Sequence, residues 1–277
     1  MAPSASTPSS APVNPSSGSG LGQPAVVNKA PAHAASAPSV TSPTGLTESA
    51  VAATGSGAAA GAAAAHNATQ ARLRHLLDSV ARQQPHLHWA IGERDDGTTV
   101  LVTDLASGWI PPNIDVPSGV HLLPPAFRRG GLEALLGDAV VIEAWTPGQF
   151  IPAEKDDQPV ATSLRARDLP AVNDLNWELT QATNWRDGLP RLAHTLTKAG
   201  IAGTGILDAE TDLLAEHLRA ISEKVLRSYP DSVDTEAVGN WQLLAAIDAL
   251  VNSQKTALNY HFAWFQALQH GKAGGNK

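Results

Sequence analysis

The sequence has no cysteine, which excludes disulfide frameworks, thiolate nucleophiles and sulfur-ligated zinc sites. Aromatic and charged side chains are almost absent from the start of the chain. Residues 1–65 contain eight prolines, no Trp, Tyr or Phe, and only two charged residues, Lys29 and Glu48. Such a segment buries too little apolar surface to offset the entropy of ordering. We therefore predict a disordered Pro/Ala/Ser-rich tail over residues 1–65, which is either a tether or an inert spacer at a fragment boundary.

Long apolar runs and a concentrated basic face are also missing. No stretch approaches the ~20 apolar residues that span a bilayer, and the N-terminus lacks the basic and apolar regions of a signal peptide. With 19 basic and 26 acidic residues, the net charge of −7 argues against nucleic acid as the main partner. We expect a cytoplasmic chain without a membrane span.

Residues 66–150 have the patterns of a small α+β domain with a mostly antiparallel sheet. A helical pattern ends at Pro85, and two apolar segments then flank residues 95–97, where Asp-Gly is a strong hairpin signal. Short strands near residues 120–123 and 139–145, with a helix near 132–136, complete this domain.

A charged, proline-containing linker is expected next, over residues 151–167. Residues 168–270 then have helical spacing throughout and predict an all-α helical bundle domain. Residues 271–277 are expected to be a disordered C-terminus.

The last helix is predicted to be long and continuous, because apolar and polar residues alternate along it at three and four positions. The positions are Leu244, Ile247, Val251, Gln254, Leu258, His261, Phe265 and Leu268. This heptad spacing predicts a helix roughly 36 Å long. An ordinary core stripe of a helical bundle is the simpler explanation of the same spacing. Phe262 and Trp264 lie off the stripe, so they are candidate anchors for a partner protein.

Tryptophan is unusually informative here because the chain has seven. Four lie in apolar patterns and are predicted to be core: Trp89, Trp145, Trp177 and Trp241. Trp109 and Trp185 lie beside loops, and with Phe262 and Trp264 they make up the candidate protein-binding residues. Burial within its own domain remains the simpler explanation for each loop-side or off-stripe tryptophan.

Residues able to carry chemistry form no recognised motif. His86 and His88 are the only tight histidine pair, and alternate residues of a strand face the same way, but no third metal ligand stands at motif spacing. The carboxylates of residues 93–96 fit a hairpin turn better than an acid/base pair. The glycine-rich residues 200–205 follow a helix instead of a strand, unlike a phosphate loop. We therefore predict no catalytic residues, no metal and no cofactor.

Two stretches carry a resemblance to a known family. The first is WAIG at residues 89–92 with DGTTVLVTDLASGWIPP at residues 96–112, and the second is NYHFAW at residues 259–264. Together they resemble the paired C-terminal domains of mycobacterial type VII (ESX) secretion-associated proteins of the EspK kind. The similarity covers roughly residues 66–270, and family members also carry a Pro/Ala-rich region ahead of these domains.

This resemblance implies a non-enzymatic cytosolic accessory protein or chaperone that binds an exported helical substrate of the secretion system, with the secretion machinery as a second candidate partner. It brings no catalytic residues with it. Two alternatives stay open: an enzyme of unrecognised type that uses the α+β domain, and an envelope-associated structural protein whose tail crosses a wall layer.

Overall fold

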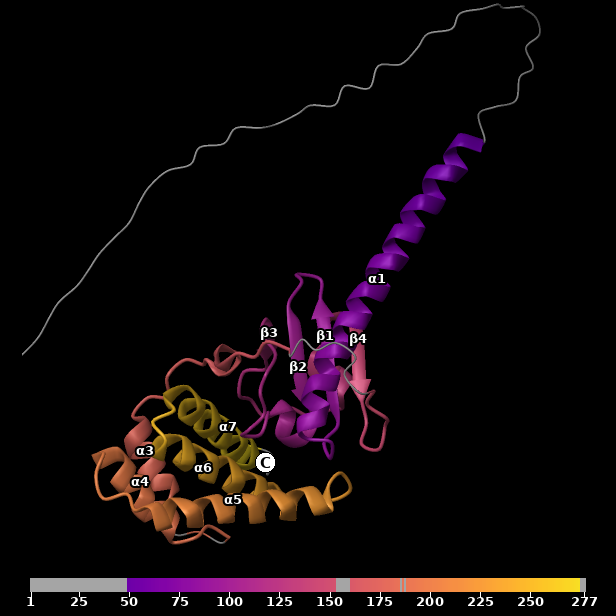
Figure 1. Ribbon diagram of the computed structural model, residues 1–277. Coiled ribbons are helices and arrows are strands. Elements are labelled where there is room, and N and C mark those ends of the chain that lie inside the picture. Colours follow the sequence, from indigo (N-terminus) through magenta and orange to yellow (C-terminus); the bar gives the residue numbers. More distant parts are fainter. Residues whose placement is uncertain (1–48, 153–159, 185, 187, 275–277) are drawn as a thin grey trace, which may run out of the picture. The chain divides into compact units, whose positions relative to one another are not determined.

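The computed structural model describes residues 49–152, 160–184, 186 and 188–274 (Figure 1). Most of the predicted tail, residues 1–48, lies outside these residues. The described chain has a small mixed sheet with helices, followed by a series of helices. Within that part of the chain, none of the helices combines the length and the apolarity needed to cross a membrane.

The sheet has four strands in the order β3-β2-β1-β4. Strand β1 (Trp89–Arg94) pairs antiparallel with β2 (Thr99–Thr103) and with β4 (Ala139–Trp145), whereas β3 (Val120–Leu122) runs parallel to β2. The predicted hairpin is confirmed: Gly97 has a φ of 78°, and the amide of Thr98 donates to the Asp96 side chain. The sheet is mixed because one of its three pairings is parallel.

Two helices cover opposite faces of the sheet. Helix α1 (Ser49–Gln83) lies on the face of β1 that carries Glu93, with which Arg72 forms an ion pair. Helix α2 (Leu132–Leu136) lies on the other face, where a β-carbon added to Gly92 would stand 3.4 Å from Cδ1 of Leu136. Gly92 therefore gives α2 and the start of β4 room to pack closely against the strand.

Five helices form the second part of the chain. They are α3 (Leu175–Ala182), α4 (Leu192–Ala202), α5 (Asp208–Ser228), α6 (Thr235–Val251) and α7 (Lys255–Gly274). Helix α6 is central: α4, α5 and α7 all pack against it, and every residue from Ala237 to Ile247 is buried. A short 3-10 helix, Leu164–Arg167, connects the two parts.

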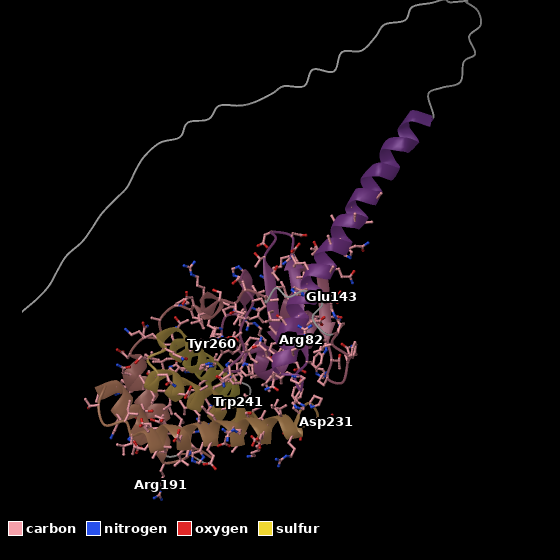
Figure 2. All side chains as sticks on the ribbon, viewed as in Figure 1. Arg82, Glu143, Arg191, Asp231, Trp241 and Tyr260 are labelled. Atoms are coloured by element: carbon pink, nitrogen blue, oxygen red, sulfur yellow. The ribbon has the colours of Figure 1, made fainter. Side chains whose placement is uncertain are left out.

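The two parts share one hydrophobic core. Its buried members include Leu77 of α1 and Ile91 of β1, together with Trp241 of α6 and with Tyr260 and Trp264 of α7. Figure 2 labels Trp241 and Tyr260 inside the body of the molecule. A second cluster, which includes Phe262, lies wholly among the helices. Residues 66–150 and 168–270 are thus packed together through this core.

The structure corrects the predicted seam helix. Helix α6 ends at Val251, Ser253 adopts a left-handed φ of 57°, and α7 begins at Lys255 and packs back along α6. The sequence pattern does not reveal this break, because Val251, Gln254 and Leu258 continue the spacing of three and four residues from the end of α6 into α7. Gln254 is exposed, so the stripe is two separate core stripes on adjacent helices.

Three predicted boundaries also differ from the structure. Helix α1 already includes residues 49–65, in keeping with the high helix propensity of alanine. The expected linker ends in a packed turn, because Thr162 bridges to Pro117 and the side chain of Arg167 is buried. Helix α7 continues to Gly274.

Candidate functional site

Asp104, at the end of β2, is the centre of a hydrogen-bond network that links the two parts of the chain. Its carboxylate accepts a hydrogen bond from the hydroxyl of Tyr229, at the end of α5, and lies 2.9 Å from Nδ1 of His88. The hydroxyl of Tyr229 in turn accepts from the backbone amide of His88 at 2.9 Å. Burial, reinforced by the bond to Asp104, raises the pKa of Tyr229, so this phenol stays protonated and donates to the carboxylate.

Residues 106–108, which follow Leu105, form a left-handed turn. Ala106 has φ and ψ of 50° and 49°, Ser107 has 64° and 26°, and Gly108 has a φ of 104°. Two consecutive non-glycine residues in this region cost free energy of order 1–3 kcal/mol each, and such strain concentrates at functional sites. Here the turn is held by Ser107, whose hydroxyl donates to the carbonyl of Arg128 at 2.9 Å.

A groove of about 540 Å³ opens beside this turn. Its walls come from both parts of the chain: Leu105 and Phe127 from the first, and Val233, Val238 and Leu268 from the second. Polar groups stand among them: Asp104, Ser107, Arg129 and Thr235. We call this the Phe127 groove. Its apolar walls with a few polar groups are typical of binding sites.

Phe127 is the exposed aromatic side chain of the groove, with 43% of its surface accessible. The guanidinium of Arg129 lies over its ring, 5.6 Å from the centroid. Helix α7 passes close by, because a β-carbon at Gly271 would stand only 2.4 Å from Phe127. The glycine at this position lets the helix form one wall of the groove.

Trp109 follows the left-handed turn and fills the contact between the two parts. Its indole lies 5.2 Å from Trp241, nearly perpendicular to it, and its Nε1 donates to Nδ1 of His261 at 3.2 Å. The amide of Ile110 donates to the hydroxyl of Tyr260 at 3.0 Å. Burial, and then the nearby positive charge of Arg167, lowers the pKa of His261 to about 3, so its ring is neutral at pH 7.

Three of the four predicted partner-binding residues are buried and are not part of an exposed surface. Trp109, Phe262 and Trp264 are at most 1% exposed, and Trp185 lies outside the described residues. The expectation that these three present themselves to a partner is therefore corrected. Phe262 and Trp264 point away from each other because α7 has two buried faces, one in the helical cluster and one in the shared core.

The prediction for the core tryptophans is confirmed for Trp89, Trp145 and Trp241 and is wrong for Trp177. Trp177 stands on α3 with 61% of its surface exposed. Helix α3 has only eight residues and buries just one of them, Leu179, so the apolar spacing around Trp177 overstated how much of the helix is covered.

The histidine pair of the sequence is separated. His86 is exposed, and His88 is engaged with Asp104. In the described part of the chain, no three His, Asp or Glu side chains come together in a group that could hold a metal ion. The carboxylate of Asp96 caps its own hairpin turn, and its pKa is lowered chiefly by the hydrogen bond from Thr98.

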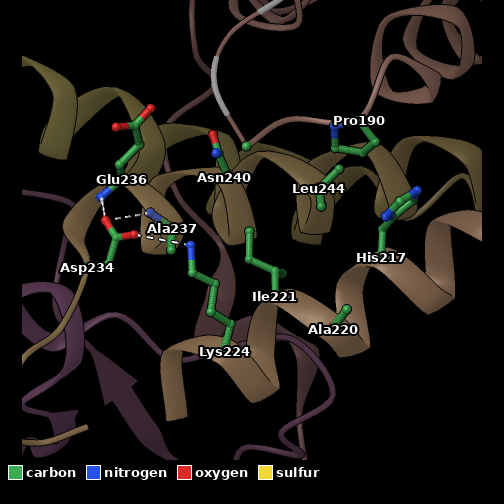
Figure 3. A pocket seen from close by; sticks show the side chains of 11 residues that line it. Pro190, His217, Ala220, Ile221, Lys224, Asp234, Glu236, Ala237, Asn240 and Leu244 are labelled. Carbon is green, nitrogen blue, oxygen red and sulfur yellow. Dashed lines mark hydrogen bonds and ion pairs between the residues drawn. The ribbon is translucent and has the colours of Figure 1, made fainter. Parts of the chain in front are cut away.

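A second hollow of about 350 Å³ lies between α5 and α6 (Figure 3). Lys224 and Asp234 lie 3.4 Å apart at one end of it, and Asp234 also caps α6 by accepting from the amides of Glu236 and Ala237. Those hydrogen bonds lower the pKa of Asp234. The carboxylate of Asp234 is thus already occupied, by capping α6 and by its ion pair with Lys224.

Sequence reasoning missed the residues that shape the site. Asp104 belongs to the long contiguous stretch that carried the family resemblance, but nothing in its spacing pointed to Tyr229, 125 residues away. Tyr229 stood out only as the end of a helix before Pro230. Phe127 is flanked by proline and arginine residues, a pattern that marks a loop without indicating which surface it faces.

Comparison with known proteins shows that two family models match consecutive segments of the chain. Residues 67–147 match a family of unknown function, DUF5632, and residues 172–268 match a second family of unknown function, DUF5631. The chain belongs to a mycobacterial family that includes the conserved hypothetical protein Rv3899c of Mycobacterium tuberculosis, a fragment of which has a solved structure.

The solved structure is a fragment, residues 184–410, of the conserved hypothetical protein Rv3899c from Mycobacterium tuberculosis. It superposes with a TM-score of 0.72 at 42% sequence identity, and covers 75% of this chain and 98% of that fragment. The uncharacterized protein Rv2082 of Mycobacterium tuberculosis is 43% identical over 257 residues. That alignment spans 91% of this chain and 35% of Rv2082, so the chain matches about a third of that relative.

Proposed function

We propose that the chain is a non-enzymatic accessory protein or chaperone of a mycobacterial type VII (ESX) secretion system, and that it binds an exported helical substrate in the Phe127 groove. The observation that carries this proposal is the groove itself, which has apolar walls from both parts of the chain and an exposed aromatic side chain at its edge. Its assignment to type VII secretion rests on the resemblance of residues 89–112 and 259–264 to proteins of the EspK kind.

A helix is the occupant that suits the groove. An amphipathic helix binds a groove through apolar side chains at intervals of three and four residues, and a volume of about 540 Å³ accommodates a small number of them. Val233, Val238 and Leu268 offer apolar contacts for these anchors. Arg129 at the edge favours a partner helix that carries an acidic residue beside its apolar anchor.

The test measures binding of the full chain to purified exported helical proteins of the mycobacterial type VII systems, by biolayer interferometry. Phe127→Glu places a charge in the groove, and because truncating an aromatic anchor commonly costs 2 kcal/mol or more, we expect affinity to fall by about 30-fold or more. Phe150→Glu is the matched control, since Phe150 is 82% exposed and does not line the groove. Its affinity should equal that of the wild type.

Two results would contradict the proposal in different ways. If none of the exported proteins binds the wild-type chain, the secretion role is wrong. If they bind but Phe127→Glu has no effect, the groove is the wrong surface. Trp177→Glu then tests a different surface, the exposed tryptophan on α3 in the helical part. Melting temperatures of all variants show whether each one is folded.

A further inference from the structure

Arg167 is a buried cation that makes no contact ion pair in the described part of the chain, although the charge of Asp115 acts on it from a longer distance. Its side chain comes from the 3-10 helix Leu164–Arg167 and is only 6% exposed. Nη2 donates to the carbonyls of Pro111 and Ile114, at 3.1 and 2.9 Å, and the guanidinium lies over the ring of Tyr260 at 5.6 Å. No ion pair joins Arg167 to a carboxylate within the described residues.

Two of the three guanidinium nitrogens, Nε and Nη1, make no hydrogen bond to the described residues. Nε is buried and has no hydrogen-bond partner, and no hydrogen bond from Nη1 occurs in the described part of the chain. Arginine carries five donors in a planar fork, so the two carbonyls satisfy only part of it. Burying a charge is costly, and burial lowers the pKa of Arg167; the negative charge of Asp115 raises this pKa and offsets only part of the burial. An anion supplied from outside would remove that cost.

Arg167 lines a pocket of about 440 Å³ that is separate from the Phe127 groove. This volume lies in the range of about 300–1,000 Å³ that small-molecule sites occupy. Its lining includes the apolar residues Pro112, Ile114, Ala245 and Ala249. Lys255, the first residue of α7, adds a second cation to the lining.

The other charges in the pocket define which anion suits it. Asp115 and Asp248 also line it, and burial raises the pKa of Asp248. Two carboxylates near the site would repel a phosphate dianion more strongly than a singly charged carboxylate. Arginine binds carboxylates through two parallel hydrogen bonds, and the apolar lining residues can contact an uncharged hydrocarbon body. We infer that the pocket binds a small organic monocarboxylate, held by Arg167.

Calorimetric titration of the full chain tests this inference with hexanoate as the probe. Hexanamide has the same size and no charge, and inorganic phosphate represents the competing anion. We expect saturable binding of one hexanoate per chain, with hexanamide and phosphate both weaker. The inference is overturned if hexanoate does not saturate, if hexanamide binds equally well, or if phosphate binds more tightly than hexanoate.

Two further measurements locate the binding at Arg167. Arg167→Met should weaken hexanoate by about 10- to 100-fold, because hydrogen bonds to a charged group are lost. Arg165→Met, an exposed arginine in the same 3-10 helix, should leave the affinity unchanged. Because Arg167 also holds two loop carbonyls, its removal can unfold the chain. The side-chain Nε–H resonance of Arg167 in the wild-type chain therefore provides a second readout: it should shift on titration with hexanoate, and a shift at Arg165 alone would overturn the assignment.

Discussion

Acid is expected to destabilise the protein through His261, the buried imidazole that accepts a hydrogen bond from the indole of Trp109. In the unfolded chain this ring titrates near pH 6.5, whereas burial and then Arg167 lower its folded pKa to about 3. Between these two values the unfolded chain binds a proton that the folded chain does not. Stability contributed by the neutral ring is therefore complete above about pH 6.5 and decreases as the pH falls toward about 3.

The size of the effect follows from the separation of the two pKa values. At about pH 4.5 the unfolded imidazole is almost fully protonated and the folded one is neutral, so the loss relative to about pH 7.5 is roughly 2–3 kcal/mol. That is a large share of the total stability of an ordinary domain, which is about 5–15 kcal/mol.

Urea unfolding at the two pH values measures this loss, with His261→Gln as the diagnostic variant. The glutamine side-chain oxygen can still accept from Trp109, but it does not titrate. The variant should therefore lose roughly 2–3 kcal/mol less than the wild type on acidification, whatever its stability at neutral pH. Carboxylates titrate alike in both proteins and cancel in the comparison.

His86→Gln is the matched control because His86 is exposed. Its pH dependence should equal that of the wild type. If the wild type and His261→Gln lose the same stability between the two pH values, His261 does not stay neutral in the folded state and the reasoning is refuted.

Two other substitutions test the hydrogen-bond network and the left-handed turn. Tyr229→Phe removes the hydroxyl that donates to Asp104, and urea unfolding should show a loss of roughly 1–2 kcal/mol; an unchanged midpoint would mean that water replaces the hydroxyl at no cost. Gly108→Ala should destabilise more than Gly97→Ala, although both glycines have positive φ: at Gly108 an added β-carbon would stand 2.9 Å from Leu123, and at Gly97 it meets open space. Equal melting temperatures for the two variants would contradict this.

Local signals predicted the elements well wherever neighbouring residues determine them. The Asp-Gly turn at residues 95–97 and the proline that follows α1 act within a few positions, and the hairpin and the end of the helix lie where they were expected. The broad order of a small sheet part followed by helices came from the same kind of signal. No such local signal predicted the parallel pairing of β2 with β3, because the pairing of strands that are distant in sequence depends on the packed sheet.

The contact between the two parts could not be predicted from sequence. Trp109 was a candidate surface anchor because it lies beside a loop, and Trp264 because it lies off the apolar stripe. Trp109 instead donates to His261, 152 residues away, and Trp264 is buried in the core that both parts share. Trp177 fits an apolar stripe and is nevertheless exposed, since none of the described residues covers it. Periodicity describes one helix at a time, whereas burial depends on every neighbour.

The shared core has a consequence for how such chains are inherited. The two matched segments, residues 67–147 and 172–268, bury Trp109, Trp241 and Tyr260 against one another. A gene that lost either segment would encode a product with these aromatic rings open to water, prone to aggregation and degradation. The two segments are therefore expected to pass from ancestor to descendant as a single heritable unit, and recombination between them should be removed by selection.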